Sequence, residues 1–152
     1  MESGLTITNG MTWSLDNRKM YLTDTLRRMI YVYDFNANQG TISNRQIFTR
    51  VMEEDGYPDG LTIDSQGYLW SARWAGWGLV RYAPTGEEVL RVMLPVACPT
   101  CCTFGGRDLR DLYITSAWTA LREVERLEQP LAGDVFRISL DHPGLPEERY
   151  LG

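Results

Sequence analysis

Two stretches of the chain place a polar oxygen-bearing side chain in the same local context. Asn9 opens "NGMTW" and Asp59 opens "DGLTI", and in both the polar residue is followed by Gly and an apolar-Thr-apolar triplet. Amide and carboxylate oxygens are groups that bind hard divalent cations, and a carboxylate can also accept a proton. Asn-Gly and Asp-Gly pairs are equally typical of hairpin turns, and the residue types alone favour the plain turn.

Few other residues offer catalytic or metal-binding chemistry. Cys98, Cys101 and Cys102 lie together in "CPTCC", but a structural zinc site needs four ligands and His142 is the single histidine. We therefore interpret the thiols as small buried residues of a strand. With one histidine and no Gly-x-Ser-x-Gly, a Ser/His/Asp triad is not expected, and no phosphate-binding glycine-rich motif is present.

The charge balance indicates which partners to expect. Fifteen basic and twenty acidic residues give a net charge of −5, which would repel a nucleic-acid backbone but suits a divalent cation or a neutral small molecule. No apolar run approaches the roughly 18 residues that span a bilayer, so no membrane association is expected. The first ten residues lack the pattern of a secretory signal, which makes the cytoplasm the expected location.

Short runs rich in aromatic and β-branched residues dominate the chain and predict antiparallel strands. They are separated by Gly-, Asn- and Asp-containing turns, and they cover residues 19–23, 30–35, 68–72, 79–82, 112–115 and 135–140. One exception is Ala120 to Glu128, whose apolar residues recur at helical spacing before Pro130 and predict a short surface helix.

The strand pattern repeats three times. The strands opened by Asn9 and Asp59 have a fainter third copy at Thr100 to Phe104, and the strands that follow each of them also correspond. Repeats of about 40 to 50 residues with four strands each are typical of β-propeller blades. We predict an all-β fold: one domain over 1–152, with three four-stranded antiparallel blades at 5–50, 56–95 and 98–140 and a tail at 141–152. Three blades do not close a ring, and their two outer faces should be apolar and exposed.

Several collinear motifs carry a resemblance to a known family. They are "ITNGMTWSLDNRKMYLTDT", "ISNRQIF", "PDGLTIDSQGYLWSARWAGWGLVRYAPTGEEV" and "CCTFGGRDLRDLYITSA". Together they resemble the C-terminal half of the regucalcin (senescence marker protein)/gluconolactonase family, nearly end to end. That resemblance implies half of a six-bladed propeller with one divalent metal at the top of its central channel, and hydrolysis of sugar lactones or related esters.

The resemblance also assigns roles to residues. It implies that Asn9 and Asp59 are metal ligands and that Asp59 is the general base. Oxygen ligands favour calcium, with magnesium, manganese or zinc as alternatives. Arg73, Trp74 and Trp77 in "ARWAGWG" follow a blade strand and are expected to line the channel mouth and contact substrate, or else to pack between blades. The apolar residues of the two echoing strands (Met11, Trp13, Leu61 and Ile63) are expected in the core.

The chain departs from the family pattern in what it lacks. The family's third metal ligand, a Glu, and its sugar-orienting Arg and Asn belong to N-terminal blades, and the context of Glu2 does not match that ligand's motif. We therefore expect a homodimer whose two halves complete the propeller and its lactonase site. The alternative is a half-propeller that binds a metal or small ligand without catalysis, and a pure interaction scaffold is a third possibility.

Overall fold

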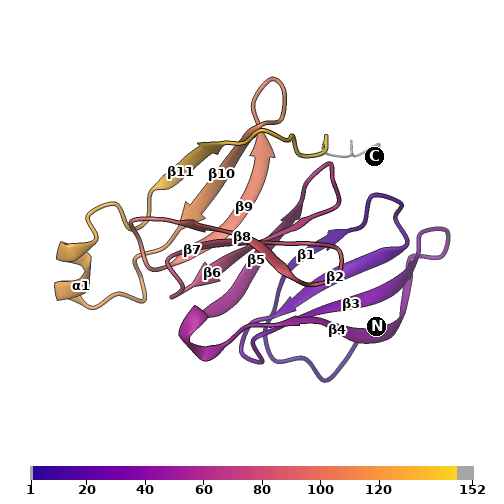
Figure 1. The fold of residues 1–152 in the computed structure, drawn as a ribbon. Helices are drawn as coiled ribbons and strands as arrows, with labels where there is room; N and C mark the ends of the chain where they lie inside the picture. The colour runs from indigo at the N-terminus through magenta and orange to yellow at the C-terminus, as the bar shows by residue number, and fades with distance from the viewer. Residues whose placement is uncertain (1, 147–152) are drawn as a thin grey trace.

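Three antiparallel sheets follow one another along the chain in the computed structural model, which describes residues 2–146 (Figure 1). Sheet 1 contains β1 (Thr8–Trp13), β2 (Lys19–Asp24), β3 (Met29–Asn36) and β4 (Thr41–Arg50). Sheet 2 contains β5 (Tyr57–Ile63), β6 (Leu69–Trp74), β7 (Gly78–Tyr82) and β8 (Glu88–Met93). Sheet 3 contains β9 (Pro99–Gly105), β10 (Asp111–Ser116) and β11 (Val135–Ser139).

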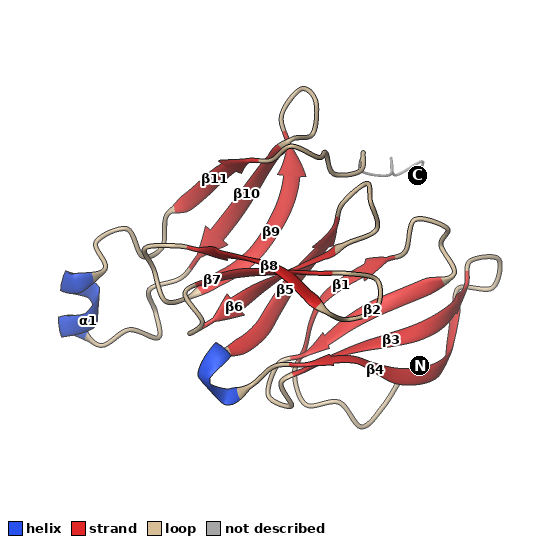
Figure 2. Ribbon diagram, in the orientation of Figure 1, coloured by secondary structure: helices blue, strands red, loops and turns tan. Residues whose placement is uncertain are grey.

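Each sheet is an up-and-down meander, as propeller blades are, and the predicted all-β propeller fold is confirmed. Helical structure in the described part is limited to the 3-10 turn η1 (Glu53–Asp55) and α1 (Glu123–Glu128) (Figure 2). The short helix predicted near the C-terminal end of the chain is therefore present as α1. The Glu125 carboxylate accepts a 2.8 Å hydrogen bond from the backbone N–H of Arg122, the residue before α1, which satisfies one unpaired donor of the first turn.

Sheet 3 has three strands within the described residues, which corrects the expectation of four strands in every blade. After β11 the chain does not turn back along that strand. It crosses instead to the β5–β6 turn of sheet 2, where Ser65 N–H donates to the Pro143 carbonyl and Asp64 forms an isolated bridge with Gly144. The last part of the predicted tail, residues 147–152, lies outside the described residues.

Sheet 2 packs with both faces against its neighbours, which explains why β6 and β7 are almost wholly buried. One face contributes Leu69 and Val80 to a cluster shared with Tyr21 and Ile30 of sheet 1. The other contributes Trp70 and Leu79 to a cluster shared with sheet 3. Alternation along each strand sends successive side chains to opposite faces, so one sheet serves two hydrophobic cores.

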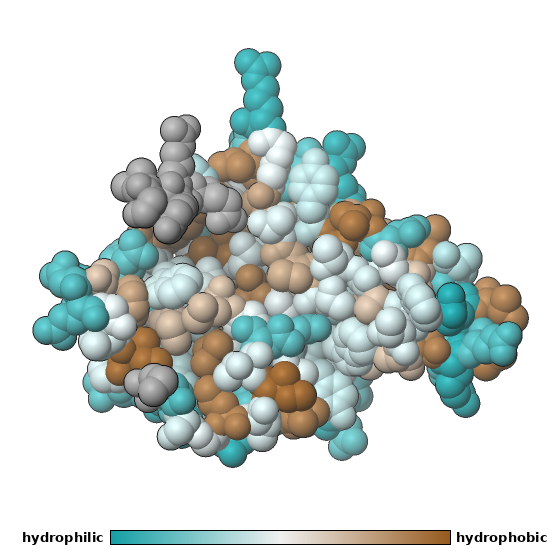
Figure 3. Space-filling view, turned by 180° about the vertical axis from the view of Figure 1, so that it is seen from behind, coloured by the Kyte–Doolittle hydropathy of each residue, from teal (hydrophilic) through white to brown (hydrophobic). Residues whose placement is uncertain are grey.

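The two outer faces differ from each other. On sheet 1, an apolar cluster is buried under Leu5 of the N-terminal segment and under other side chains of the same sheet, among them Phe35 and Ile42; its members are Met20, Leu22, Tyr31 and Tyr33. On sheet 3, the residues that alternate with the core positions include exposed Thr115 and Arg137. The expectation of two exposed apolar faces is therefore wrong. From behind, apolar side chains reach the surface in separate places among polar ones (Figure 3).

The first strands of the three sheets, β1, β5 and β9, lie side by side, with β5 in the middle. Their approach is too close for a side chain at two positions. A Cβ atom on Gly10 would lie 2.3 Å from the Leu61 backbone nitrogen, and one on Gly60 would lie 2.6 Å from the Cα atom of Cys101. The Gly that follows Asn9 and the Gly that follows Asp59 are thus required by strand packing, and neither pair forms a hairpin turn.

We expect Gly60→Ala to lower the free energy of unfolding by about 2 to 4 kcal/mol, because the new methyl group meets backbone atoms of β9 that cannot move independently. Urea unfolding followed by circular dichroism measures this. Gly40→Asn is the control: Gly40 has open space around it and a φ of 63°, which Asn tolerates, so a change below about 1 kcal/mol is expected. Equal losses in the two variants would contradict the packing argument.

Candidate functional site

The side chains of Asn9 and Asp59 are positioned by a β-bulge in each of two neighbouring strands. The register of β1 on β2 shifts between Thr8 and Met11, and the register of β5 on β6 shifts between Pro58 and Leu61. In each case two residues, the polar one and its Gly, stand opposite a single partner residue. A bulge breaks the strict alternation and re-aims a side chain, so both polar groups are turned toward the same end of the inner strands.

These two side chains line one cavity of about 340 Å³. Trp74 at the end of β6 and Tyr57 at the start of β5 form part of its wall, and Ile7, Thr25 and Leu26 complete the lining. The cavity therefore combines two oxygen-bearing groups with a mainly apolar wall. This is the character of a small-molecule site, in which a few polar groups orient a ligand among apolar neighbours.

Asp59 is unusual because it is a carboxyl group that is 8 % exposed and has no ion pair within the described residues. Burial raises its pKa to about 6, and a hydrogen bond from the Asn9 side chain opposes part of that shift. A buried carboxyl group without a cation is costly in its charged form. A bound cation would remove that cost, so the environment of Asp59 suits a metal ligand or a base that operates near neutral pH.

Asn9 can present its amide oxygen to a cation. Its Nδ2 atom lies 3.4 Å from Thr25 Oγ1 in a weak hydrogen bond, and Thr25 lines the same cavity. An amide whose nitrogen donates to a neighbour has its oxygen available as a ligand. The donor set of the cavity is thus one carboxylate and one amide oxygen, which fits calcium or magnesium better than a soft metal.

Three residues expected at the channel mouth lie in different places. Trp74 lines the cavity with Asn9 and Asp59. Arg73, its neighbour on β6, points to the opposite face: it is 1 % exposed, and its guanidinium donates to Ser71 Oγ at 3.1 Å and to the Tyr82 hydroxyl. Arg73 therefore packs between sheets 1 and 2 and does not reach the cavity. Trp77 is exposed on the β6–β7 turn and is absent from the cavity lining.

The core expectations held for two of the four apolar residues of the echoing strands. Leu61 and Ile63 are buried, and Trp13 is half-buried against the Phe35 ring. Met11 is 50 % exposed. It follows the bulge on β1, and within residues 2–146 β5 is the one inner strand that packs against β1, on one side only.

Sequence reasoning missed Tyr57, Ile7, Thr25 and Leu26 as cavity residues. Tyr57 stands two residues before Asp59 on the same strand, but the bulge between Pro58 and Leu61 breaks the alternation there, so strand periodicity alone could not place the two side chains together. Thr25 and Leu26 lie on the β2–β3 turn, which the pairing of β1 with β2 brings next to Asn9. That contact required the register of the sheet, which the sequence pattern did not specify.

The cysteines are free thiols: Cys98 and Cys102 are buried as expected, whereas Cys101 is exposed and Cys98 lies just before β9, which corrects the expectation of three buried strand residues. Burial raises the pKa of the Cys98 and Cys102 thiols, which keeps them protonated and poorly nucleophilic. Within residues 2–146 no three His, Cys, Asp or Glu side chains group closely enough to hold a metal ion. Asp59 therefore stands without two further acidic, histidine or cysteine side chains beside it in that part of the chain. No helix among the described residues has the length and apolar character to cross a membrane.

Comparison with known proteins places this geometry in context. A sequence model of the SMP-30/gluconolactonase/LRE-like region matches residues 1–118. Regucalcin of Danio rerio is 38% identical over 96% of this chain and 50% of its own length. Pentonolactonase XacC of Haloferax volcanii is 37% identical over 98% of this chain and 53% of its own length.

A solved structure agrees. The crystal structure of regucalcin from Agrobacterium tumefaciens, described as a calcium-binding protein, superposes with a TM-score of 0.88 at 27% identity, covering 93% of this chain and 48% of that one. The chain thus spans about half the length of the relatives it matches.

We expect Asp59→Asn to stabilise the cation-free protein above pH 6. The folded-state pKa of Asp59 is about 6, against 3.8 ordinarily. As pH rises through this interval the unfolded chain ionises more readily than the folded one, so the native protein loses stability. Asn avoids that loss. Because the carboxyl group is partly solvated, we expect a gain of about 1 to 2 kcal/mol in the free energy of unfolding.

The measurement is urea unfolding in chelator at pH 8 and at pH 4. At pH 4 the free energies of unfolding of the parent and of Asp59→Asn should be equal. The control is Asp108→Asn, at an exposed carboxylate on the β9–β10 turn, which should change stability at neither pH. An Asp59→Asn variant that is less stable than the parent at pH 8 would show that the carboxylate is not buried at a cost.

Proposed function

The chain belongs to the SMP-30/gluconolactonase/LRE-like family, and from this membership and the Asn9–Asp59 cavity we propose that it acts as a metal-dependent hydrolase of sugar lactones or related esters. The observation that carries the proposal is the pair of equivalent bulges, which bring an amide oxygen and a buried carboxyl group into one cavity. The names of its relatives, among them a pentonolactonase, support a lactone as substrate.

Asn9 and Asp59 are proposed to hold one divalent cation, with calcium favoured by the oxygen donor set and by the calcium-binding description of a related regucalcin. Magnesium, manganese and zinc are the alternatives. When bound, such an ion polarises a carbonyl oxygen and lowers the pKa of water. The buried carboxyl group of Asp59 gains a compensating charge in that state, which keeps it ionised.

Asp59 is also the proposed base. Ionised Asp59 takes a proton from the water molecule that attacks the lactone carbonyl carbon, and the ring C–O bond then breaks. The proton passes to the departing alkoxide oxygen, so that the product is the open-chain hydroxy acid. Trp74 and Tyr57 limit water access to the cavity wall and offer rings on which the lactone ring can pack. Arg73 has no part in this proposal because its guanidinium is committed between the sheets.

The site is incomplete in one copy of the chain, since two protein ligands leave most of a calcium ion's coordination sphere open. A ring of two copies would supply the rest. Two copies related by a two-fold axis place sheet 1 of each against sheet 3 of the other, and the ring closes after two such contacts. Leu5 packs on the outer face of sheet 1, and Glu2 nearby pairs with Arg45 at 2.9 Å, so this segment is what sheet 3 of the partner would meet.

A half-propeller that binds a cation or small ligand without catalysis remains the second candidate. It is favoured by the absence, within residues 2–146, of a third acidic, histidine or cysteine ligand near the pair. For either function we propose a cytoplasmic location, which the three free cysteines support, because thiols persist in reducing compartments.

Hydrolysis of D-glucono-δ-lactone separates the two functions. We expect the parent protein with calcium to hydrolyse it above the spontaneous rate, and Asp59→Ala to lower kcat/KM by about a hundredfold or more, because both a ligand and the base are lost. Chelator should abolish the activity and added calcium should restore it. Asp108→Asn should behave as the parent. Calcium binding without any hydrolysis would establish the non-catalytic alternative.

The oligomeric state tests the assembly. Sedimentation or light scattering at micromolar concentration should give twice the mass of the chain, and Arg137→Glu, a charge reversal on the outer face of sheet 3, should weaken the dimer while leaving the fold intact. Arg137 is a surface residue, 3.5 Å from Asp111. A strictly monomeric protein that still hydrolyses lactones would rule out completion of the site by a second copy.

A further inference from the structure

A second cavity of about 340 Å³ lies within the long β10–β11 connection. All its lining residues come from this single connection, between Trp118 and Ala132. The connection leaves β10 where Ser116 pairs with Pro99, at the start of β9, so it stands at the same end of the sheets as Asn9 and Asp59. Unlike the Asn9–Asp59 cavity, this one needs nothing from outside the chain.

The connection is held in place by specific contacts. The buried Gln129 side chain accepts a 2.6 Å hydrogen bond from the Ala97 N–H through its Oε1 atom. Ser116 Oγ accepts from the Gly133 N–H at 3.0 Å and donates to the Asp134 carbonyl at 2.7 Å. A Cβ on Gly133 would lie 2.6 Å from the Trp118 ring. These contacts hold Gln129 and the two ends of the connection in place.

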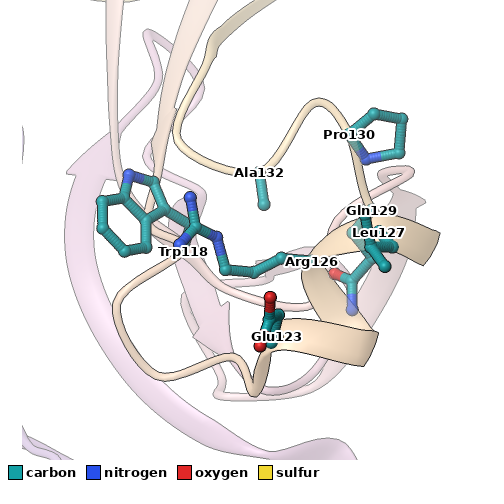
Figure 4. Close-up of a pocket in the computed structure, with 7 residues that line it drawn as sticks. All are labelled: Trp118, Glu123, Arg126, Leu127, Gln129, Pro130 and Ala132. Carbon is teal, nitrogen blue, oxygen red and sulfur yellow. The ribbon is translucent and has the colours of Figure 1, made fainter.

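Arg126 is positioned without using its hydrogen-bond donors. Its guanidinium stacks on the Trp118 ring, 3.7 Å from the centroid, and both groups form part of the cavity wall (Figure 4). Within residues 2–146 no carboxylate pairs with it and no side-chain hydrogen bond engages it. Arg122 on the preceding turn differs, because its guanidinium binds the Glu125 carboxylate at 2.8 Å. A stacked guanidinium with free donors is preorganised to bind an anion.

The other polar groups of the cavity indicate which hydrogen-bonding groups the anion has. The Glu123 carboxylate can accept hydrogen bonds from ligand donors, and the Gln129 amide N–H₂ can donate, because only its oxygen is used by Ala97. Leu127, Pro130 and Ala132 supply apolar contact. A matching ligand combines a carboxylate for Arg126 with nearby hydroxyl groups for Glu123. A neutral polyol lacks the first feature, and acetate lacks the second.

We propose that this cavity binds a small polyhydroxy carboxylate, the class of open-chain acid that lactone hydrolysis releases. The cavity alone indicates a carboxylate that also carries hydrogen-bond donors. The choice of a sugar acid among such ligands rests on the proposed function. Bound there, the acid is held apart from the Asn9–Asp59 cavity, in a separate site for the reaction product.

Calorimetric titration of the purified chain with sodium gluconate, in chelator and without lactone, tests the proposal independently of metal binding and turnover. We expect saturable binding by the parent and by Arg122→Gln, the matched control on the same connection. Arg126→Gln should weaken binding by about tenfold or more, because a charge-assisted contact is lost. Sorbitol and acetate should bind at least about tenfold more weakly than gluconate. Circular dichroism checks that each variant is folded.

Three results would overturn the proposal. The first is no gluconate binding by the parent, and the second is an equal loss of gluconate affinity in Arg122→Gln and Arg126→Gln. The third is a loss of gluconate affinity in Asp59→Ala that Arg126→Gln does not show. The last would mean that the acid occupies the Asn9–Asp59 cavity. A carboxylate with hydrogen-bond donors could be a sugar acid or an amino acid, and titration with serine distinguishes them. Tighter binding of serine than of gluconate would overturn the assignment to a sugar acid. A protein that fails to hydrolyse lactones yet binds gluconate through Arg126 refutes only the proposed function.

Discussion

The contact between neighbouring inner strands governs the rest of the molecule. Where β1 meets β5 and β5 meets β9, the backbones approach so closely that Gly10 and Gly60 have no space for a side chain. Directly before each Gly a bulge interrupts the ladder to the second strand of its sheet. The extra residue turns its side chain away from the alternating pattern, and in both strands that residue has an oxygen-bearing side chain. Strand packing and site geometry are thus set by the same two-residue unit.

The third inner strand, β9, has an inner-strand neighbour on one side only. In the repeat, Cys101 occupies the position of Gly10 and Gly60, and its register with β10 also shifts, between Thr115 and Ser116. Among the described residues no further inner strand follows β9, and Cys101 is exposed although its sulfur lies next to Gly60 of β5. The middle sheet, which has both neighbours, is the most completely buried. The third inner strand carries Thr100 at the position of Asn9 and Asp59, and its hydroxyl lies 2.7 Å from Thr115 Oγ1 on β10.

Strand positions were predictable because alternating apolar residues and Gly-, Asn- or Asp-containing turns are local signals. The blade repeat followed from the spacing of those signals, and it located Asn9 and Asp59 as equivalent residues. The orientation of single side chains was less accessible. Arg73 and Trp74 are adjacent in sequence, and only the position of β6 in the fold shows that Trp74 lines the cavity while Arg73 lies against Tyr82, a member of the cluster shared by sheets 1 and 2. The three-stranded third sheet also depended on a long-range contact, the bridge of Asp64 with Gly144.

We propose that Asn9 and Asp59 together bind one divalent cation. The most direct measurement is a crystal structure of the calcium-loaded protein with anomalous diffraction. We expect a single anomalous peak in the cavity, with Asn9 Oδ1 and an Asp59 carboxylate oxygen both about 2.3 to 2.6 Å from it. A cavity without a peak at saturating calcium, or an ion bound elsewhere with Asp59 still unpaired, would contradict it.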